Sequence, residues 1–374
     1  MSIGRKCLMA DPIALYDLRY EELAELLQGW GEPSFRADQL WNWLYRSLAD
    51  DFEAMGNLPL TLRERMAKET VLTLLEPIDE EVSASGLTRK VLFRLRDGNT
   101  VESVRMDYHD RRTACISTQA GCGMGCVFCA TGQGGLSRNL SPGEIVAQVL
   151  YFAREIRTQE IERANALGYQ AEIPEHPVSN VVLMGMGEPL ANYEGTLQAL
   201  ETLADDRGYN LGARRITLST VGLVPGMRRL VAEGMPINLA VSLHAPTDEL
   251  RDRIVPVNRR YPVQELMQAV REYVAATGRR VTFEYALIDG VNDSLEHARD
   301  LAELLAGMLC HVNLIPLNPT PGSPLQPSPR ERVDAFRQEL QWAGIPVTVR
   351  MRRGIDIEAG CGQLRQRQTN IELG

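Results

Sequence analysis

The hydrophobic positions of residues 113–351 switch repeatedly between two spacings. Strand-like apolar runs are predicted at 113–118, 179–184, 214–220, 236–243, 281–287, 311–317 and 345–351. Between them, helical spacing predicts helices at 142–157, 194–204, 262–276, 295–308 and 330–343. Alternating strands and helices form parallel sheets, and this number of units predicts an α/β fold with a partial (β/α)6 barrel.

The first 107 residues have a different pattern. Apolar side chains recur at helical spacing from about 16 to 70, and Ser34 is a candidate N-cap for the helix that begins at Phe35. From about 80 to 107, two alternating runs flank Asp97-Gly98-Asn99, a turn signal that predicts a β-hairpin. A small N-terminal helical domain and a β-hairpin extension are therefore expected ahead of the barrel.

These patterns divide the chain into four parts. We expect a helical accessory domain at 1–75, a hairpin linker at 76–107, a core at 108–354 and a C-terminal loop at 355–374. Arg36 and Arg46 would suit an RNA-binding accessory domain, because arginine matches phosphate well. A packing module is equally compatible with the sequence.

Composition indicates a globular protein with no membrane segment. The 374 residues are 44% hydrophobic, with a mean hydropathy of −0.19, so the chain can bury a large core. No apolar run reaches the ~18 residues that span a bilayer, and the N-terminus lacks a signal-peptide hydrophobic region. Seven cysteines, three of them in one loop, argue against a secreted disulfide framework. A cytoplasmic protein is expected, and nothing suggests more than a monomer.

Charge leaves the partner open. A net charge of −9 would normally count against a nucleic-acid binder. Lysine, however, occurs only at positions 6, 68 and 90, so nearly all basic residues are arginines, many in pairs such as Arg111-Arg112 and Arg352-Arg353. Arginine binds phosphate and stacks on bases, although a GC-rich genome would produce the same composition.

The most informative motif is Cys122-Gly-Met-Gly-Cys126-Val-Phe-Cys129. Three thiolates at this spacing can hold three corners of a [4Fe–4S] cube, because the glycines let the backbone wrap tightly around the sulfides. The fourth iron is then open to a substrate or cofactor. A zinc site would need a fourth ligand, and no C-x2-C or H-x3-H pair stands elsewhere. A ferredoxin-type site would need another cysteine where Ala130-Thr131-Gly132 stands.

Candidate ligand-binding residues follow several of the predicted strands. They are Gly187 and Glu188 after the second strand, Ser219 at the end of the third, Ser242, Leu243 and His244 at the end of the fourth, and Asn318 after the sixth. Barrels of this kind place chemistry at the C-terminal ends of their strands, so these residues should meet the cysteine loop. Each alone would be explained as a turn or a buried structural residue. Their shared position favours ligand binding.

Two further cysteines have informative positions. Cys361 lies between two glycines just past the last strand, where a loop could fold over the barrel mouth. Cys115 lies inside the first barrel strand, near the cysteine loop. Both could also be ordinary thiols, as we expect Cys7 and Cys310 to be.

Together these motifs resemble the RlmN family of dual-specificity RNA adenine-C2 methyltransferases. The resemblance rests on the three clustered cysteines, Gly185-Met-Gly-Glu-Pro189, Ser242-Leu-His244 and the stretch 354–364 around Cys361, and it extends into the helical zone at Phe35-Arg-Ala-Asp-Gln-Leu-Trp. Gly360 stands where the family usually has alanine, which should only loosen the loop. Residues 158–177 look like a surface insertion.

The resemblance implies a radical S-adenosylmethionine (SAM) enzyme that carries one [4Fe–4S] cluster and uses two SAM molecules per turnover. One SAM would methylate Cys361, and the other would yield a 5′-deoxyadenosyl radical that removes hydrogen from this methyl group. The resulting methylene radical would add to C2 of adenine, and Cys115 would resolve the adduct through a disulfide with Cys361. Glu102 matches the family's proton acceptor, although Cys115 could also take the C2 proton. The implied ligands are Cys122, Cys126 and Cys129 for the cluster, and Gly187, Glu188, Ser219, Ser242, Leu243, His244 and Asn318 for SAM.

The resemblance also implies the substrates and partners. The targets would be adenosine 2503 of 23S rRNA and adenosine 37 of tRNAs, each presented as an unstacked base because pairing hides C2. The arginines of 350–353 would contact phosphate, and an electron donor such as flavodoxin would reduce the cluster.

Two rival interpretations remain. The Cfr family methylates C8 of the same rRNA adenosine and shares the cysteine patterns, but Pro189 and the complete helical zone favour RlmN. A rival from another class is a non-catalytic Fe–S sensor or RNA-binding protein. It would not need Cys115 and Cys361 or a carboxylate at Glu188.

Overall fold

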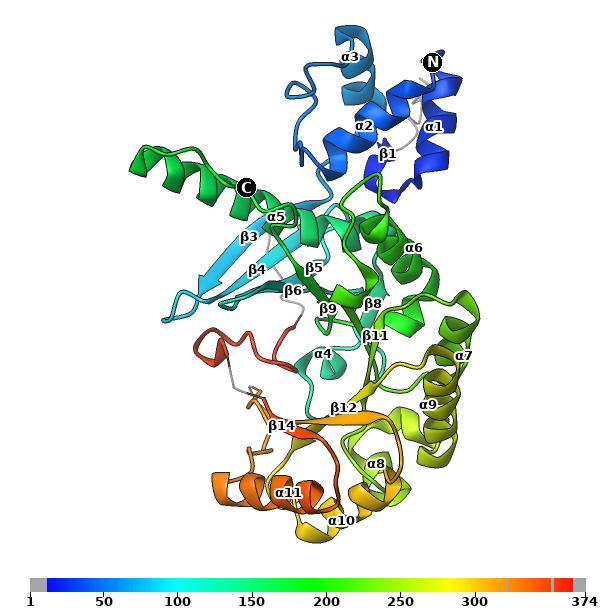
Figure 1. Cartoon of the computed structure of the whole chain (residues 1–374), viewed down its shortest axis with the longest axis vertical. Helices are drawn as coiled ribbons and strands as arrows, with labels where there is room; N and C mark the ends of the chain where they lie inside the picture. Colours follow the sequence, from blue (N-terminus) through cyan, green and yellow to red (C-terminus); the bar gives the residue numbers. More distant parts are fainter. Residues whose placement is uncertain (1–11, 321, 351–352, 366–374) are drawn as a thin grey trace, which may run out of the picture.

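A ten-stranded sheet forms the centre of the computed structural model, which describes residues 12–320, 322–350 and 353–365 (Figure 1). Seven neighbouring strands run parallel in chain order: β6 (Arg112–Cys115), β9 (Asn180–Leu183), β10 (Ile216–Thr220), β11 (Asn238–Ser242), β12 (Val281–Leu287), β13 (Cys310–Pro316) and β14 (Val347–Val349). Because β6 and β14 do not pair, the barrel stays open. The predicted α/β fold is confirmed.

Each of the first six parallel strands is followed by a major helix before the next strand. These helices are α5 (Pro142–Leu167), α6 (Tyr193–Ala204), α7 (Val224–Glu233), α9 (Val263–Thr277), α10 (Leu295–Leu304) and α11 (Arg330–Trp342), with α8 (Asp248–Ile254) preceding α9. Six strand–helix units with a final strand match the predicted (β/α)6 barrel. Helices α7 and α8 were not predicted from the sequence, and α8 has only seven residues, too few to show a helical repeat clearly.

Helix α5 is longer than the sequence predicts. It runs unbroken from its Ser141 capping box to Leu167, so the first half of 158–177, the stretch expected to be a surface insertion, is helical. Its end stands away from the rest of the fold (Figure 1), and the Leu167 side chain there is exposed.

The predicted hairpin is part of a larger antiparallel extension. Strands β4 (Thr88–Leu95) and β5 (Thr100–Asp107) form the hairpin, and β3 (Leu75–Val82) pairs with the outer side of β4. The sequence did not predict β3, because much of its surface is acidic and exposed. Since β5 pairs with β6, the extension continues the barrel sheet and is not a separate linker.

The N-terminal part is helical, as predicted, and its described residues form α1 (Tyr20–Gly29), α2 (Phe35–Tyr45) and α3 (Leu60–Glu69). A short parallel pair, β1 (Ile13–Ala14) and β2 (Thr70–Val71), brings its ends together. The predicted cap at Ser34 is wrong: the residue has helical dihedral angles and its side chain makes no capping hydrogen bond. A cap residue must instead be extended to place its oxygen over the first turn.

The arginines considered for RNA binding contact the protein itself. Arg36 is half-buried, donates a hydrogen bond to Gln39 and forms an ion pair with Glu32. Arg46 donates to the main-chain oxygens of Asp206 and Gly208 in the barrel part, at 2.6 and 3.3 Å. These two side chains therefore support a packing role. RNA binding by the N-terminal part stays a prediction.

Candidate active site

The cysteine motif lies in a loop between two short antiparallel strands. Strand β7 (Gln119–Gly121) leads into it, and α4 (Ala130–Gln133) and β8 (Leu136–Asn139) follow. Gly121 has a φ of +83°, and a Cβ there would lie 2.1 Å from the carbonyl oxygen of Gly135. The same carbonyl accepts a 2.7 Å hydrogen bond from the Cys122 N–H. Only glycine lets the two sides of the loop approach this closely.

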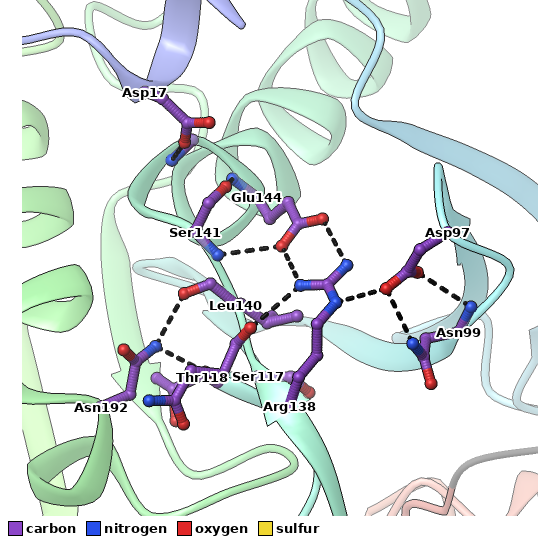
Figure 2. Close-up of polar contacts among 12 residues, drawn as sticks. Asp17, Asp97, Asn99, Ser117, Thr118, Arg138, Leu140, Ser141, Glu144 and Asn192 are labelled. Atoms are coloured by element: carbon purple, nitrogen blue, oxygen red, sulfur yellow. Dashed lines mark hydrogen bonds and ion pairs between the residues drawn. The ribbon is translucent and has the colours of Figure 1, made fainter. Parts of the chain in front are cut away.

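Arg138 anchors the base of this loop (Figure 2). Its guanidinium makes paired hydrogen bonds of 2.7 and 2.8 Å to Glu144, bonds to Asp97 in the hairpin turn, and donates to the Asn139 carbonyl. Glu144 belongs to the capping box of α5, where it also accepts from the Ser141 N–H. The cysteine loop, the hairpin and α5 are thus held together by one cation.

The three thiols are close enough to influence one another. Burial raises the pKa of Cys122 to about 12, and it raises that of Cys126 further, with the neighbouring thiols adding to both effects. Among the described residues, no three His, Cys, Asp or Glu side chains are placed to hold a single metal ion.

A cavity of about 150 Å³, here called the cysteine cavity, is lined by all three thiols and by the C-terminal ends of the parallel strands. The predicted site residues that line it are Cys122, Cys126, Cys129, Gly187, Glu188, Ser219, Ser242, His244, Asn318 and Cys361. These residues therefore meet in one cavity, as expected from their positions at the ends of successive strands. Leu243 lies outside this set: its side chain is buried in the core, and its main-chain oxygen accepts from Arg251.

Glu188 places a carboxylate in this cavity. Its side chain is 2% exposed and accepts hydrogen bonds from the Leu190 and Val221 N–H groups, at 3.0 and 2.8 Å. Burial nevertheless raises its pKa to about 7. Gly187 before it has a φ of +102° and passes so close to Gln119 that a Cβ would lie 2.6 Å from that side chain. The carboxylate is suited to accept from a ligand amino group.

His244 is a neutral hydrogen-bond donor in this site. Its Nδ1 accepts from the Ala286 N–H at 2.9 Å, which leaves the proton on Nε2. Burial, together with the positive charge of Arg251, lowers its pKa to about 3. The ring packs edge-on against Phe128 of the cysteine loop, 4.7 Å between centroids.

The two serines lie side by side on adjacent strands. Ser219 of β10 and Ser242 of β11 have their hydroxyl oxygens 3.4 Å apart. Asn318, after β13, donates from Nδ2 to the main-chain oxygen of Cys361 at 3.1 Å, while its buried Oδ1 has no protein partner. These groups could bind the hydroxyl or carboxylate groups of one ligand.

A second, larger cavity adjoins the first. This lumen cavity, about 500 Å³, is lined by inward-facing residues of the sheet, including Cys115. The two cavities share the side chains of Met184, Glu284, Ile315, Asn318, Arg350 and Cys361. Cys361 therefore lies between the thiol-lined space and the lumen. Cys115 is buried, and its pKa is raised to about 12 by burial and by the adjacent Cys361 thiol.

Two charged residues in the shared wall were not recognised from the sequence as candidates for the barrel interior. Glu284 is almost fully buried in β12, where Asn313 donates to it at 2.9 Å and burial raises its pKa. Arg350 follows β14 and interacts electrostatically with Cys361, Glu284 and Cys115, so it points to the interior and not to an outer RNA surface. The sequence feature that could have identified Glu284 is its position as a single charged residue within the otherwise uncharged strand Val281–Leu287. Arg352, from the segment predicted to contact phosphate, lies outside the described residues.

Glu102, predicted as a proton acceptor, does not line either cavity. Glu102 is 1% exposed and accepts from the main-chain N–H of Arg365 at 2.9 Å, beneath the C-terminal loop and outside the lining of both cavities.

Gly360 is closely surrounded by side chains. A Cβ on Gly360 would lie 2.6 Å from Asn318 Nδ2 and 2.7 Å from Gln363 Oε1. The glycine thus permits close packing of these two side chains, and its effect on the looseness of the loop stays a prediction.

The C-terminal loop is bonded directly to the cysteine loop. Ala130 N–H donates to the Gly362 carbonyl at 2.8 Å, and the Thr131 hydroxyl bonds to the Leu364 carbonyl. Cys361 is therefore held at the cysteine cavity by main-chain contacts. The residues fit a three-thiol cluster and an amino-acid ligand: three adjacent thiols, a buried carboxylate and the unpartnered Asn318 Oδ1 face one space.

This open barrel with a three-cysteine loop at the C-terminal ends of its strands defines a radical SAM protein. The sequence profile described as the radical SAM superfamily matches residues 116–305, and the ribosomal RNA large subunit methyltransferase N-terminal domain matches residues 13–72.

The whole chain has close relatives. It is 51% identical to "Dual-specificity RNA methyltransferase RlmN 1" of Myxococcus xanthus, over 94% of each chain, and 55% identical to an RlmN protein of Chloroflexus aurantiacus, over 95% of this chain and 93% of the relative. It is 53% identical to the crystal structure of a radical SAM methyltransferase from Sphaerobacter thermophilus, with a TM-score of 0.87 over 95% of this chain and 99% of that one. The chain belongs to the RlmN family. No helix of the described residues is long and apolar enough to cross a membrane.

Proposed function

We propose that this protein methylates C2 of adenosine 2503 in 23S rRNA and of adenosine 37 in tRNAs, through a methylated Cys361. The observation that carries the proposal is the position of Cys361, which lines both the cysteine cavity and the lumen cavity. A group carried on its sulfur could be loaded from one side and delivered to a base from the other. The family relationship supplies the RNA specificity.

Cys122, Cys126 and Cys129 would hold the [4Fe–4S] cluster, with Glu188, Ser219, Ser242, His244 and Asn318 around SAM. Gly187 would allow close approach of the backbone, and Leu243 would contribute through its main chain only. When bound, the cluster and SAM supply a methyl group and the radical chemistry that an electron-poor adenine carbon requires. The protein's own groups orient the ligand: Glu188 accepts from its amino group, His244 donates from Nε2, and Asn318 offers Oδ1.

Cys115 would resolve the bond between Cys361 and the product by forming a disulfide with Cys361. The electrostatic interaction of the two thiols supports this role, as does the position of Cys115 in the lumen cavity. Cys115 in the lumen cavity would accept the C2 proton only as a thiolate, which its raised pKa opposes, while Glu102 lies beneath the C-terminal loop. Glu102 would serve as acceptor only if that loop moved.

The single-electron donor would be a reduced flavoprotein such as flavodoxin. The side chains of Val127 and Leu136 are exposed at the cysteine loop, and the Val127 N–H bonds to the Ile254 carbonyl, beside the exposed Arg253. An apolar surface next to a positive charge suits an acidic redox partner. We further propose a cytoplasmic monomer.

The variants Cys361→Ala and Cys115→Ala test this proposal in anaerobically reconstituted enzyme. Cys361→Ala should abolish RNA methylation and the methyl mark on the protein, yet still cleave SAM weakly. Cys115→Ala should load the methyl group and retain RNA covalently. Cys310→Ala is the matched control, since Cys310 is a buried thiol at the start of β13 and outside both cavities. Methylation by Cys361→Ala at the wild-type rate would refute the proposal.

A further inference from the structure

Two arginine side chains surround one tyrosine ring at the lumen cavity. The guanidinium carbons of Arg111 and Arg353 lie 4.2 and 4.3 Å from the centroid of the Tyr108 ring. The three residues lie between β5 and β6 and after β14, so the fold brings together segments distant in the sequence. All three line the lumen cavity, as Cys361 does.

Main-chain contacts fix this arrangement. The Tyr108 N–H donates to the Arg111 carbonyl at 2.8 Å, which closes a tight turn between β5 and β6. Arg353 donates from its guanidinium to the Asp107 carbonyl at 3.1 Å. The second arginine is thereby held to the sheet edge from which Tyr108 projects. The three side chains form a defined unit, here called the Arg–Tyr–Arg clamp.

The clamp concentrates positive charge. The face of an aromatic ring attracts a guanidinium, but two guanidiniums at one ring repel each other. Among the residues that the structure describes, Arg111 has one ion pair, an exposed contact of 3.2 Å with its neighbour Asp110. Within the described part of the chain, the Arg353 guanidinium forms no ion pair with a carboxylate. Arg215, which also lines the lumen cavity, likewise has no ion pair among these residues. An anion would relieve the repulsion between the two cations.

We propose that the Arg–Tyr–Arg clamp binds the phosphodiester of a nucleotide that flanks the target adenosine in single-stranded RNA. This inference rests on the proposed function. Arg111 and Arg353 would be the binding groups, because a guanidinium presents a planar set of donors to phosphate oxygens. Tyr108 would be a positioning residue, since guanidiniums already occupy its ring and leave it little surface for a base. The clamp lines the cavity that contains Cys361, so it would hold the strand while the target base enters.

The test measures RNA affinity directly. An unmodified tRNA anticodon stem-loop would be titrated with anaerobically reconstituted enzyme at several salt concentrations, with fluorescence anisotropy as readout. Arg353→Gln and Tyr108→Leu should each weaken binding about tenfold, and Arg353→Gln should reduce the slope of log affinity against log salt by about one. Tyr108→Phe should bind like the wild type, because it retains the ring.

The matched control is Tyr193→Leu. Tyr193 also carries an arginine over its ring, with Arg229 at 4.0 Å from the centroid, but it lies at the start of α6 and lines neither cavity. Tyr193→Leu should therefore leave RNA affinity unchanged. SAM cleavage without RNA should be the same in all variants, which would show that the cysteine cavity is intact.

Two outcomes would overturn the clamp. One is wild-type affinity in both Tyr108→Leu and Arg353→Gln; the other is equal weakening in Tyr193→Leu, which would indicate a general effect of surface charge. Failure of the proposed function can be told apart from failure of the clamp, because in the first case the wild-type enzyme itself would leave RNA unmethylated.

Discussion

The side-chain amide of Asn318 donates a hydrogen bond to the main-chain carbonyl of Cys361 at 3.1 Å. This bond connects the loop after β13 to the loop that carries the proposed methyl acceptor. The other end of the amide, Oδ1, is buried without a protein partner and lies where both cavities meet. One side chain can therefore position Cys361 and also bind a ligand.

Asn318→Ala should slow methylation of Cys361 by about 10- to 100-fold, since it removes the bond to the loop and the free acceptor together. Peptide mass spectrometry after single-turnover incubation with SAM would give the rate. Asn238→Ala is the matched control: Asn238 also donates its amide to a main-chain carbonyl, that of Arg214 at 2.7 Å, but outside the site. Equal rates in the two variants would refute a positioning role for Asn318.

Gly121→Ala should prevent cluster assembly. The new Cβ would lie 2.1 Å from the Gly135 carbonyl oxygen, in a main-chain region that cannot simply move aside. Iron content and the visible absorbance of the reconstituted protein would be measured. Gly98→Ala has a similar φ, +86°, but open space around it, so it should retain a full cluster at a modest cost in stability. A full cluster in Gly121→Ala would contradict the close packing of this loop.

Arg138→Met should lower the free energy of unfolding by about 2 kcal/mol, because it breaks several charge-assisted hydrogen bonds to groups that include the largely buried Glu144. Figure 2 shows that these bonds join three parts of the fold, so cluster content should fall as well. Arg94→Met removes a similar paired contact with the exposed Glu76 and should cost less than about 1 kcal/mol. Chemical denaturation compares the two variants. An equal loss would contradict an anchoring role for Arg138.

SAM affinity should rise with pH and level off above about pH 7. Burial raises the pKa of Glu188 to about 7, so the carboxyl is neutral below that pH and accepts a ligand amino group best above it. The ordinary pKa of the unfolded state is 4.5, so the unliganded protein should lose stability as pH rises from about 4.5 to 7. Equilibrium dialysis between pH 5.5 and 8.5 would give the dissociation constants. Glu188→Ala should bind weakly with no such dependence, and a flat wild-type profile would contradict this assignment.

Residues whose positions follow from strand order could be predicted. Glu188, Ser242 and Asn318 each lie at or just after the end of a parallel strand, and parallel strands place these ends on one face. Local spacing alone also identified the three thiols. For such residues, the spacing of apolar positions in the sequence locates the strand ends, and the parallel topology then places those ends together.

Residues placed by the open edge of the barrel could not be predicted. Tyr108 and Arg353 meet because β14 ends the sheet without pairing with β6, and the chain then returns toward β5. Glu284 faces the interior because of the register of β12, which an apolar pattern does not reveal for a single charged position. Strand β3 was not predicted because most of its residues are exposed and polar, so its sequence lacks the alternation of apolar and polar residues that marks a strand.

The central claim is most directly tested by locating the methyl group on the RNA. Anaerobically reconstituted enzyme would be incubated with SAM, a reductant and an unmodified 23S rRNA fragment or tRNA, and the digested nucleosides would be compared with standards by mass spectrometry. We predict 2-methyladenosine. A methyl group on C8 would assign the Cfr reaction to this chain, and unmethylated RNA despite an intact cluster and SAM cleavage would contradict the proposed substrate.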